Sequence, residues 1–307
     1  MDYILRTVNV SKRYRSDWVL KNVNMNIQRG DIYGFVGENG SGKTTIIRLI
    51  TGLISANEGH VELFGIPSDS PEITAVRKKI GAIVESPSIY RNMSARDNLL
   101  MQSTILGIND EEKIKQVLCD VELGELYQNP KKAGNFSLGM RQRLGIAMAL
   151  LGSPEFIILD EPMNGLDPAG IVGIRELILK LNREQGITFL ISSHILNELA
   201  LVANKYGIIS HGSLIKEITD EELRNQCRPT TAIEAAEHQA LWDLLSKDFP
   251  AEDLLHLARG VRITGAVELN ALLARIIEAE ISILSVNCYK TSIEDYYLSL
   301  LGGGRHA

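Results

Sequence analysis

A glycine-rich stretch that ends in lysine and threonine, GENGSGKTT at residues 37–45, has the residue types and spacing of a phosphate-binding loop. An apolar run that predicts a strand precedes it, and a helical pattern runs from Lys43 to about Thr51. Glycines let backbone N–H groups close around phosphate oxygens, and a helix N-terminus adds a partial positive charge. Lys43 can reach the outer phosphates of ATP, and the hydroxyl of Thr44 can hold Mg²⁺. The residues expected to bind the nucleotide in this loop are Gly37, Glu38, Asn39, Gly40, Ser41, Gly42, Lys43, Thr44 and Thr45.

Two adjacent carboxylates follow a second apolar run. Residues 156–159, FIIL, predict a buried strand that ends in Asp160 and Glu161. Asp160 can hold Mg²⁺, directly or through water, and Glu161 can orient or deprotonate an attacking water. Two acids can also do no more than cap a strand, but the presence of a phosphate-binding loop favours the catalytic interpretation.

A histidine follows a third apolar run, ITFLISSH at residues 187–194. Open α/β sheets bind their ligands at the carboxyl ends of the strands. A single histidine in this place is more often structural, yet the other motifs favour a catalytic His194 that reaches the γ-phosphate.

The stretch KAGNFSLGMRQRLG, residues 132–145, permits two interpretations. Asn135 and Ser137 are good helix N-caps, and the apolar residues that follow fit a buried helix. The same serine and glycine at a helix N-terminus could instead form an anion site and complete half of an ATP site.

Composition limits the class of protein. The chain has 307 residues, 45% of them apolar, which suits one large domain with a small one or two domains. A formal net charge of −6 argues against a nucleic-acid binder that works by bulk charge. The three cysteines are far apart, so we expect neither a disulfide scaffold nor a zinc site, and a reducing cytoplasm suits them. No signal peptide and no apolar run near the ~18 residues of a membrane span are evident, so a soluble protein is expected.

Strands that alternate with helices over the first part of the chain predict a mainly parallel α/β sheet. Val23, Met25 and Ile27 alternate with polar residues as in a half-buried strand, and a helix is expected from about Pro168 to Glu184 with Gly186 as its stop. The composition changes near residues 225–231, and the segments beyond predict a small α+β appendage. Its expected elements are the helical LWDLLSKD and ELNALLARIIEAE and the strand-like GVRITG and ISILSVNCY.

The motifs in their order along the chain resemble the ATPase subunits of ATP-binding cassette (ABC) transporters. These motifs are the phosphate-binding loop, the serine-glycine helix start, LDEP, GLDP and SSH, and the resemblance covers residues 1 to about 225. It implies an α/β P-loop NTPase core with a mainly parallel sheet, an antiparallel β subdomain and a helical subdomain at about 88–152. Residues 226–307 would then form a C-terminal α+β accessory domain.

The resemblance also implies roles for single residues. Ser137 and Gly139 match the segment that reaches across to the ATP held by a second subunit, although Leu138 and Met140 depart from the usual glycine and glutamine. Tyr14 matches the aromatic residue that stacks on adenine, with Trp18 as a rival. Asp167 matches the aspartate that links the two subunits' sites.

Glu85, in ESPSIY, falls where most members of the family have a glutamine that senses Mg²⁺ and the attacking water. A carboxylate there can approach Mg²⁺ or accept a hydrogen bond from water. Glu85 is therefore expected to act as a metal ligand and as a catalytic residue that tunes coupling. This glutamate, the run ESPSIYRNMSARDNL and the later SIEDYYLSL are similar to the bacitracin-resistance and lantibiotic-immunity branch.

The resemblance implies an ATPase with ATP and Mg²⁺ as cofactors, on the cytoplasmic face of a membrane. It would power export of a peptide antibiotic or similar amphiphile through a separate integral-membrane permease, as a homodimer or heterodimer of ATPase subunits and without nucleic acid. An importer and a non-transport regulatory ABC ATPase remain as alternatives. An unrelated P-loop kinase is disfavoured because it would leave the signature helix, LDEP and the histidine unexplained.

Overall fold

The computed structural model describes residues 3–108, 110–290 and 292–301. The chain divides into two compact units between Asp220 and Glu221. Across the described residues, no helix combines the length and the apolar character that crossing a membrane requires.

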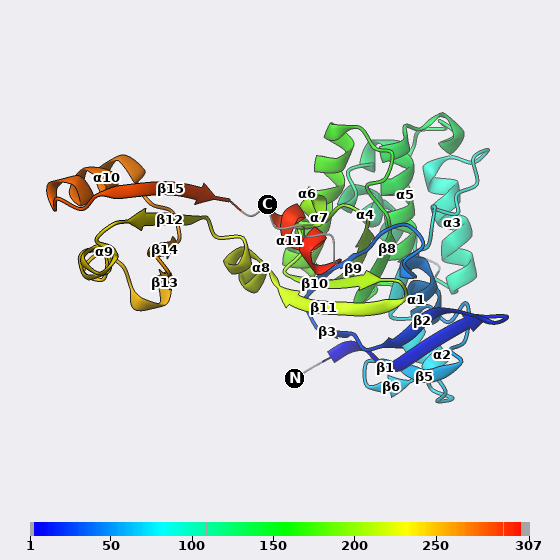
Figure 1. Cartoon of the computed structure of the whole chain (residues 1–307). Coiled ribbons are helices and arrows are strands. Elements are labelled where there is room, and N and C mark those ends of the chain that lie inside the picture. Colours follow the sequence, from blue (N-terminus) through cyan, green and yellow to red (C-terminus); the bar gives the residue numbers. More distant parts are fainter. Residues whose placement is uncertain (1–2, 109, 291, 302–307) are drawn as a thin grey trace. The chain divides into compact units, whose positions relative to one another are not determined.

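A six-stranded sheet forms the centre of the first unit, and four of its strands, β8 to β11, are labelled in Figure 1. Its strand order is β11-β10-β4-β9-β8-β7. All its neighbouring strands are parallel except β11, which runs antiparallel to β10. Every residue of β4, β8 and β9 is buried, which explains their unbroken apolar runs, since helices cover a parallel sheet on both faces. The strands are β4 (Ile32–Val36), β7 (Ile80–Ile83), β8 (Phe156–Asp160), β9 (Thr188–Ser193), β10 (Lys205–Ser210) and β11 (Ser213–Thr219).

A second, antiparallel sheet completes the β structure of this unit. The prediction of one strand through residues 23–27 was wrong in one respect. Val23 ends one strand and Ile27 lies in the next, although Val23, Met25 and Ile27 are all buried as their alternation predicts. The strands are β1 (Tyr3–Tyr14), β2 (Asp17–Val23), β3 (Asn26–Gln28), β5 (Glu58–Leu63) and β6 (Ile66–Pro67).

The helices α3, α4, α5 and α6 of the first unit each begin at a side chain that accepts a backbone hydrogen bond. Ser94 and Asp97 form a capping box, and Ser137 accepts a hydrogen bond from the amide of Met140, so Ser137 is the N-cap and Asn135 lies in a short 3₁₀ turn. Gly186 ends its helix with a φ of 67°, as predicted. The helices are α1 (Lys43–Ile50), α2 (Ile73–Arg77), α3 (Ala95–Leu106), α4 (Glu111–Asp120), α5 (Leu138–Leu150), α6 (Pro168–Gln185) and α7 (Leu196–Leu199), with 3₁₀ turns η1 (Gly124–Leu126) and η2 (Ala133–Asn135).

The core joins the two sheets through α1. Ile46 and Ile47 of α1 are fully buried between Phe35 of β4 and residues of the antiparallel sheet such as Leu63. Burial of each such side chain contributes about 1.5–3 kcal/mol. The helix that follows the glycine-rich loop is therefore fixed by packing before any ligand binds.

The second unit is a four-stranded antiparallel sheet in the order β13-β14-β12-β15, with α9 and α10 in its chain connections. The order of elements is β-α-β-β-α-β, the split βαβ arrangement. Its own core includes the fully buried Ile233, Leu241, Ile263 and Ile276. All four elements expected in this segment are present. The elements are α8 (Asp220–Gln226), β12 (Thr230–Ala235), α9 (His238–Leu245), η3 (Ala251–Asp253), β13 (Leu254–Leu257), β14 (Gly260–Thr264), α10 (Leu269–Glu278), β15 (Ile283–Tyr289) and α11 (Ile293–Leu300).

Candidate nucleotide site

The glycine-rich loop joins β4 to α1 and needs its glycines for two different reasons. Gly40 and Gly42 have φ values of 82° and 111°, in the region that side chains rarely adopt. At Gly37 the reason is space, because a Cβ there would lie 2.5 Å from the carbonyl oxygen of Ile209. The loop therefore bends back over the start of α1, as phosphate binding at a helix N-terminus requires.

Tyr33 anchors the strand that leads into this loop. Its hydroxyl donates a hydrogen bond to Glu217 Oε1 at 2.8 Å. Burial raises the pKa of Tyr33 well above its ordinary value, and the Glu217 carboxylate raises it further. The phenol therefore stays protonated and keeps donating, which ties β4 to β11.

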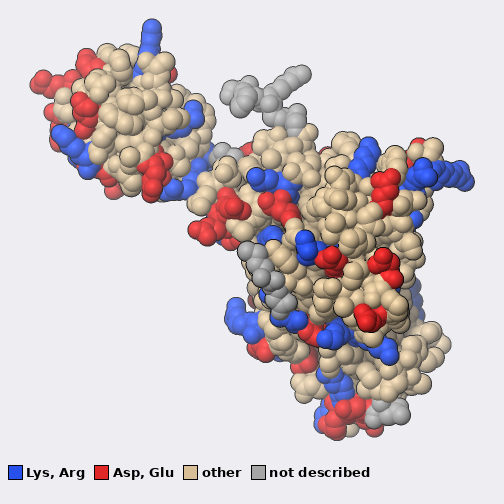
Figure 2. All heavy atoms as spheres, turned by 90° about the horizontal axis from the view of Figure 1, so that it is seen from below, with Lys and Arg blue, Asp and Glu red and all other residues tan. Residues whose placement is uncertain are grey.

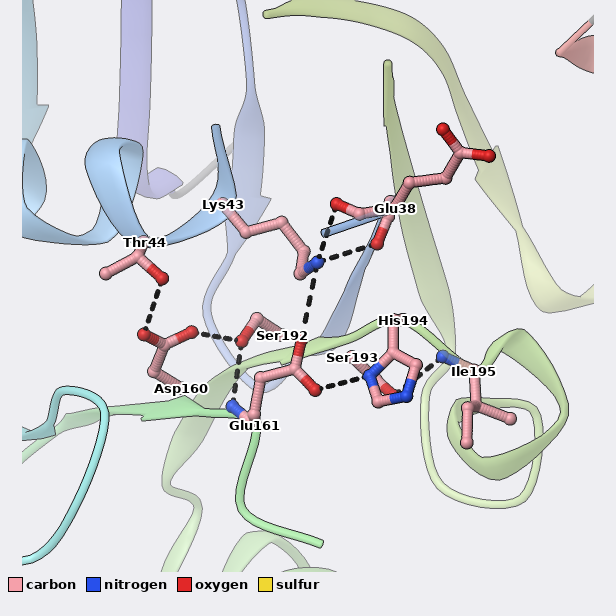
Figure 3. Close-up of polar contacts among 10 residues, drawn as sticks. Glu38, Lys43, Thr44, Asp160, Glu161, Ser192, Ser193, His194 and Ile195 are labelled. Atoms are coloured by element: carbon pink, nitrogen blue, oxygen red, sulfur yellow. Dashed lines mark hydrogen bonds and ion pairs between the residues drawn. The ribbon is translucent and has the colours of Figure 1, made fainter. Parts of the chain in front are cut away.

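Lys43 is buried, with 6% of its surface exposed. Its Nζ donates to the carbonyl oxygens of Gly37 at 2.6 Å and Glu38 at 3.1 Å, and it lies 3.3 Å from Glu161 Oε1 (Figure 3). A buried ammonium group needs such partners because leaving it unpaired costs several kcal/mol. These contacts hold Lys43, the one cation of the loop, beside Glu161.

Asp160 ends β8 and is almost fully buried. Its Oδ2 accepts a hydrogen bond from Thr44 Oγ1 at 2.9 Å, and its Oδ1 accepts one from Ser192 Oγ at 2.6 Å (Figure 3). The predicted pair of oxygen ligands, Thr44 and Asp160, is therefore brought together. Hydroxyl and carboxylate oxygens of this kind are what Mg²⁺ prefers.

Glu161 lies between Lys43 and His194. One carboxylate oxygen faces the lysine, and the other lies 2.7 Å from His194 Nδ1 (Figure 3). Its backbone has a φ of 50°, which turns the side chain away from the strand direction of Asp160. Asp160 therefore contacts Thr44, whereas Glu161 contacts Lys43 and His194, so the two neighbouring acids are suited to different roles.

Ser192 is a residue of this site that the sequence reasoning missed. Its hydroxyl donates to Asp160 and accepts from the backbone amide of Glu161 at 2.9 Å, so it orients both acids. The one sequence signal was its place inside the SSH motif, because its pairing with Asp160 across the parallel strands is evident only in the structure. A small cavity of about 130 Å³ opens beside Glu161 and His194.

Ser137, Gly139 and Asp167 lie apart from this cluster. Ser137 and Asp167 are exposed N-caps of α5 and α6, and Asp167 Oδ1 accepts a hydrogen bond from the amide of Gly170 at 3.1 Å. Within residues that the structure describes, no hydrogen bond or ion pair joins them to Lys43 or Thr44 of the same chain. Both helix starts are exposed, and the partial positive charge of a helix N-terminus can attract an external anion there.

Glu85 makes a contact that the sequence did not indicate. Its carboxylate forms an ion pair with Arg48 of α1, and its backbone φ is 65°. Among the described contacts, none joins Glu85 to Thr44 or Asp160. A role in metal binding by Glu85 thus stays a prediction, and Arg48 is its observed partner.

Two aromatic residues flank the turn between β1 and β2. Tyr14 is 44% exposed and Trp18 is 38% exposed. Lys12 Nζ lies 5.4 Å from the centre of the Tyr14 ring, and the Arg13 guanidinium lies 5.5 Å from Trp18. Both rings keep enough open surface to stack on a base, so the choice between them stays open.

The residues of the loop fit a bound nucleotide. Ser41 Oγ is buried and has no hydrogen-bond partner in the described part of the chain. A buried hydroxyl without a partner is unfavourable by about 1–3 kcal/mol, so its position calls for an external group with oxygen atoms. A phosphate held against the N–H groups of the loop would supply that partner.

Strand, glycine-rich loop, buried lysine and strand-end acids together define a P-loop nucleoside triphosphatase. Residues 20–164 match the ABC transporter family. The chain is 40% identical over 306 residues to the bacitracin transport ATP-binding protein BcrA of Bacillus licheniformis, covering 99% of each chain. It is 44% identical over 214 residues to the lantibiotic transport ATP-binding protein SrtF of Streptococcus pyogenes, covering 70% of this chain and 90% of that protein.

A solved structure of similar fold is the ATP-binding cassette MJ0796, described as a dimeric post-hydrolysis state bound to ADP and Pi. It has a TM-score of 0.62 and 28% identity, and the match covers 70% of this chain and 98% of that one. The chain therefore belongs to the ABC transporter family as an ATP-binding, ATP-hydrolysing subunit. The family, the fold and the ATPase activity expected from the motifs are confirmed.

Proposed function

We propose that this chain powers export of a peptide antibiotic or a similar amphiphile through a separate integral-membrane permease. The names of BcrA and SrtF support this cargo class, since they are a bacitracin and a lantibiotic transport protein. Glu85 and the ESPSIY segment favour the same branch. The chain would work on the cytoplasmic side of the membrane and need no nucleic acid. On the face shown in Figure 2, basic and acidic side chains intermingle without a large basic patch.

In the proposed site, the phosphate-binding loop from Gly37 to Thr45 holds the phosphates of ATP, with Lys43 between loop and γ-phosphate. Thr44 and Asp160 hold Mg²⁺, which supplies charge neutralisation at the phosphates. Glu161 accepts the proton of the attacking water, and the contact with His194 Nδ1 orients that carboxylate. The loop's remaining binding residues include Ser41, whose buried hydroxyl donates to a phosphate oxygen.

The proposed active form contains two ATPase subunits. Ser137 and Gly139 of one subunit close over the ATP held by the other, and Asp167 links the two sites. The exposure of Ser137 and Asp167 at two helix N-termini supports this arrangement, because such ends attract anions. Tyr14 stacks on the adenine. The dimeric state of the MJ0796 cassette supports the same stoichiometry.

A groove of about 640 Å³ is the proposed docking surface for the permease. It is lined by Leu53 and Leu106, by β7, by residues 84 and 86–88 and by one face of α5. Gly145 of α5 lies so close to Pro87 that a Cβ would approach it to 2.6 Å, which fixes the floor of the groove. Glu85 lies between the lining residues 84 and 86, so a permease bound there could respond to whether Glu85 is paired with Arg48.

The observation that carries the proposal is the placement of Glu161 between Lys43 and His194. Glu161→Gln should lower ATP hydrolysis about 10²-fold or more while ATP still binds, because the amide keeps the shape but cannot accept the proton. Light scattering should show that ATP and Mg²⁺ strengthen the dimerisation of this variant. Glu155→Gln is the matched control, since Glu155 lies before the same strand and pairs with Arg29 and Lys79.

Equal loss of ATP binding and hydrolysis in Glu161→Gln would contradict the role of Glu161. The export proposal has its own test in the source cells. Deleting the gene should raise sensitivity to bacitracin or to a lantibiotic, wild-type protein should restore resistance, and Glu161→Gln should not. Unchanged sensitivity to both bacitracin and lantibiotics would overturn the proposed cargo but would not contradict the ATPase activity.

A further inference from the structure

Strand β15 forms one edge of the sheet in the second unit. It is seven residues long, ILSVNCY, and contains neither a charged residue nor proline. Among the described residues it pairs with β12 on one side and with no strand on the other. Leu284 and Tyr289 are 57% and 51% exposed, and Cys288 is exposed as well.

A bare edge of this kind exposes a row of backbone N–H and C=O groups that can pair with another strand. Proteins usually protect such edges by making them short or by placing charged residues or proline on them. The opposite edge, β13, has only four residues and thus little length to offer. On β15 the single protective feature is a register shift at its start, between the partners of Glu234 and Ala235.

We propose that β15 pairs antiparallel with β15 of a second copy of this chain, so that two four-stranded sheets become one. A twofold axis makes the same strand its own complement, and the absence of charge removes like-charge repulsion across the axis. Antiparallel pairing brings the Leu284 end of one strand to the Tyr289 end of the other.

We favour a second copy over another partner because pairing of β15 with itself gives a closed dimer. A strand that pairs with itself about a twofold axis uses up its free edge and leaves only the short β13 edges outside, so the assembly stops at two. The ATP-dependent pairing proposed for the first unit would also bring two second units into one assembly, which raises their effective concentration. The β15 contact itself involves no nucleotide, so it should persist without ATP.

The test uses the full chain without nucleotide in sedimentation velocity over a concentration series. Wild-type protein should show a monomer–dimer equilibrium. Leu284→Lys should weaken it at least about tenfold, because it places a charged lysine on the edge strand that the contact would bury. Leu255→Lys is the matched control, since Leu255 is similarly exposed on the opposite edge strand, and it should dimerise like wild type.

A cross-linking measurement tests the same β15 contact in a chain that carries no added charge on this strand. With Cys119 and Cys227 replaced by serine, Cys288 on β15 is the remaining cysteine of the sequence. A bis-maleimide cross-linker should then give a covalent dimer without ATP, and adding Leu284→Lys should abolish it. Circular dichroism of each variant checks that it is folded.

A wild-type chain that stays monomeric at every concentration would overturn the proposal. So would dimers that Leu284→Lys and Leu255→Lys weaken equally, because the contact would then not be at β15. An ATP-dependent dimer of Glu161→Gln could still form in either case, so failure of the β15 contact and failure of the proposed ATP sandwich are distinguishable.

Discussion

The two units place their reactive groups on different parts of a sheet. In the first unit, the carboxyl ends of parallel strands carry Asp160 and Glu161 beside the buried Lys43, and each of these groups has a named polar partner. In the second unit, apolar residues of the sheet pack into a core, and one edge of the sheet is the uncharged strand β15. In the first unit the ends of the strands thus hold the candidate catalytic groups. In the second unit the free side of an edge strand is the proposed contact with another chain.

The largest effect should come from removing the cation of the first unit. Lys43→Ala should nearly abolish ATP hydrolysis and weaken ATP binding, because the loop loses its charge towards the phosphates. Arg262→Ala, an exposed cation on β14 of the second unit, should leave both unchanged. The measurements are steady-state ATPase rates and nucleotide-binding titration. If the two variants lost hydrolysis equally, the separation of the units would be refuted.

A smaller effect should come from Ser192→Ala. It removes the hydroxyl that holds Asp160 Oδ1 and the amide of Glu161, and a buried hydrogen bond lost in this way costs about 1–3 kcal/mol, or about 5- to 150-fold in the hydrolysis rate. The Mg²⁺ concentration for half-maximal activity should rise with it, which a purely structural role would not produce. Ser285→Ala on β15 is the control, and an unchanged rate in Ser192→Ala would contradict the orienting role.

The smallest effect should come from Arg48→Ala. The Arg48–Glu85 pair is exposed to water, so its direct energy is below about 1 kcal/mol, and folding stability should hardly change. In Arg48→Ala, Glu85 has lost its partner, and the Mg²⁺ concentration for half-maximal hydrolysis should change a few-fold. Adding Glu85→Gln to this variant should suppress that change. Arg228→Ala breaks an ion pair with Asp253 in the second unit and should leave the Mg²⁺ dependence unchanged. Identical Mg²⁺ curves for wild type and Arg48→Ala would show that the pair is inert.

Local chemistry explains how far the sequence predicted these features. The loop from Gly37 to Thr45, the strand before Asp160 and the stop at Gly186 follow from backbone and periodic rules that act over a few residues. Ser192 and Arg48 were missed because their roles depend on partners brought close by strand pairing and by packing of α1. The free edge of β15 was invisible for the same reason, since an edge is defined only by the order of strands in the sheet.

Ser137 shows how a helix start can prepare a contact that does not yet exist. Its hydroxyl oxygen already accepts a hydrogen bond from the amide of Met140, and this bond fixes the side chain while leaving the hydroxyl proton to donate elsewhere. Most of the rotational entropy that a contact with phosphate would otherwise lose has therefore been lost during folding. In the proposed dimer, one oxygen atom would therefore serve both to cap α5 and to contact the second chain's nucleotide. A mutation that spares the helix could then still uncouple the two cassettes.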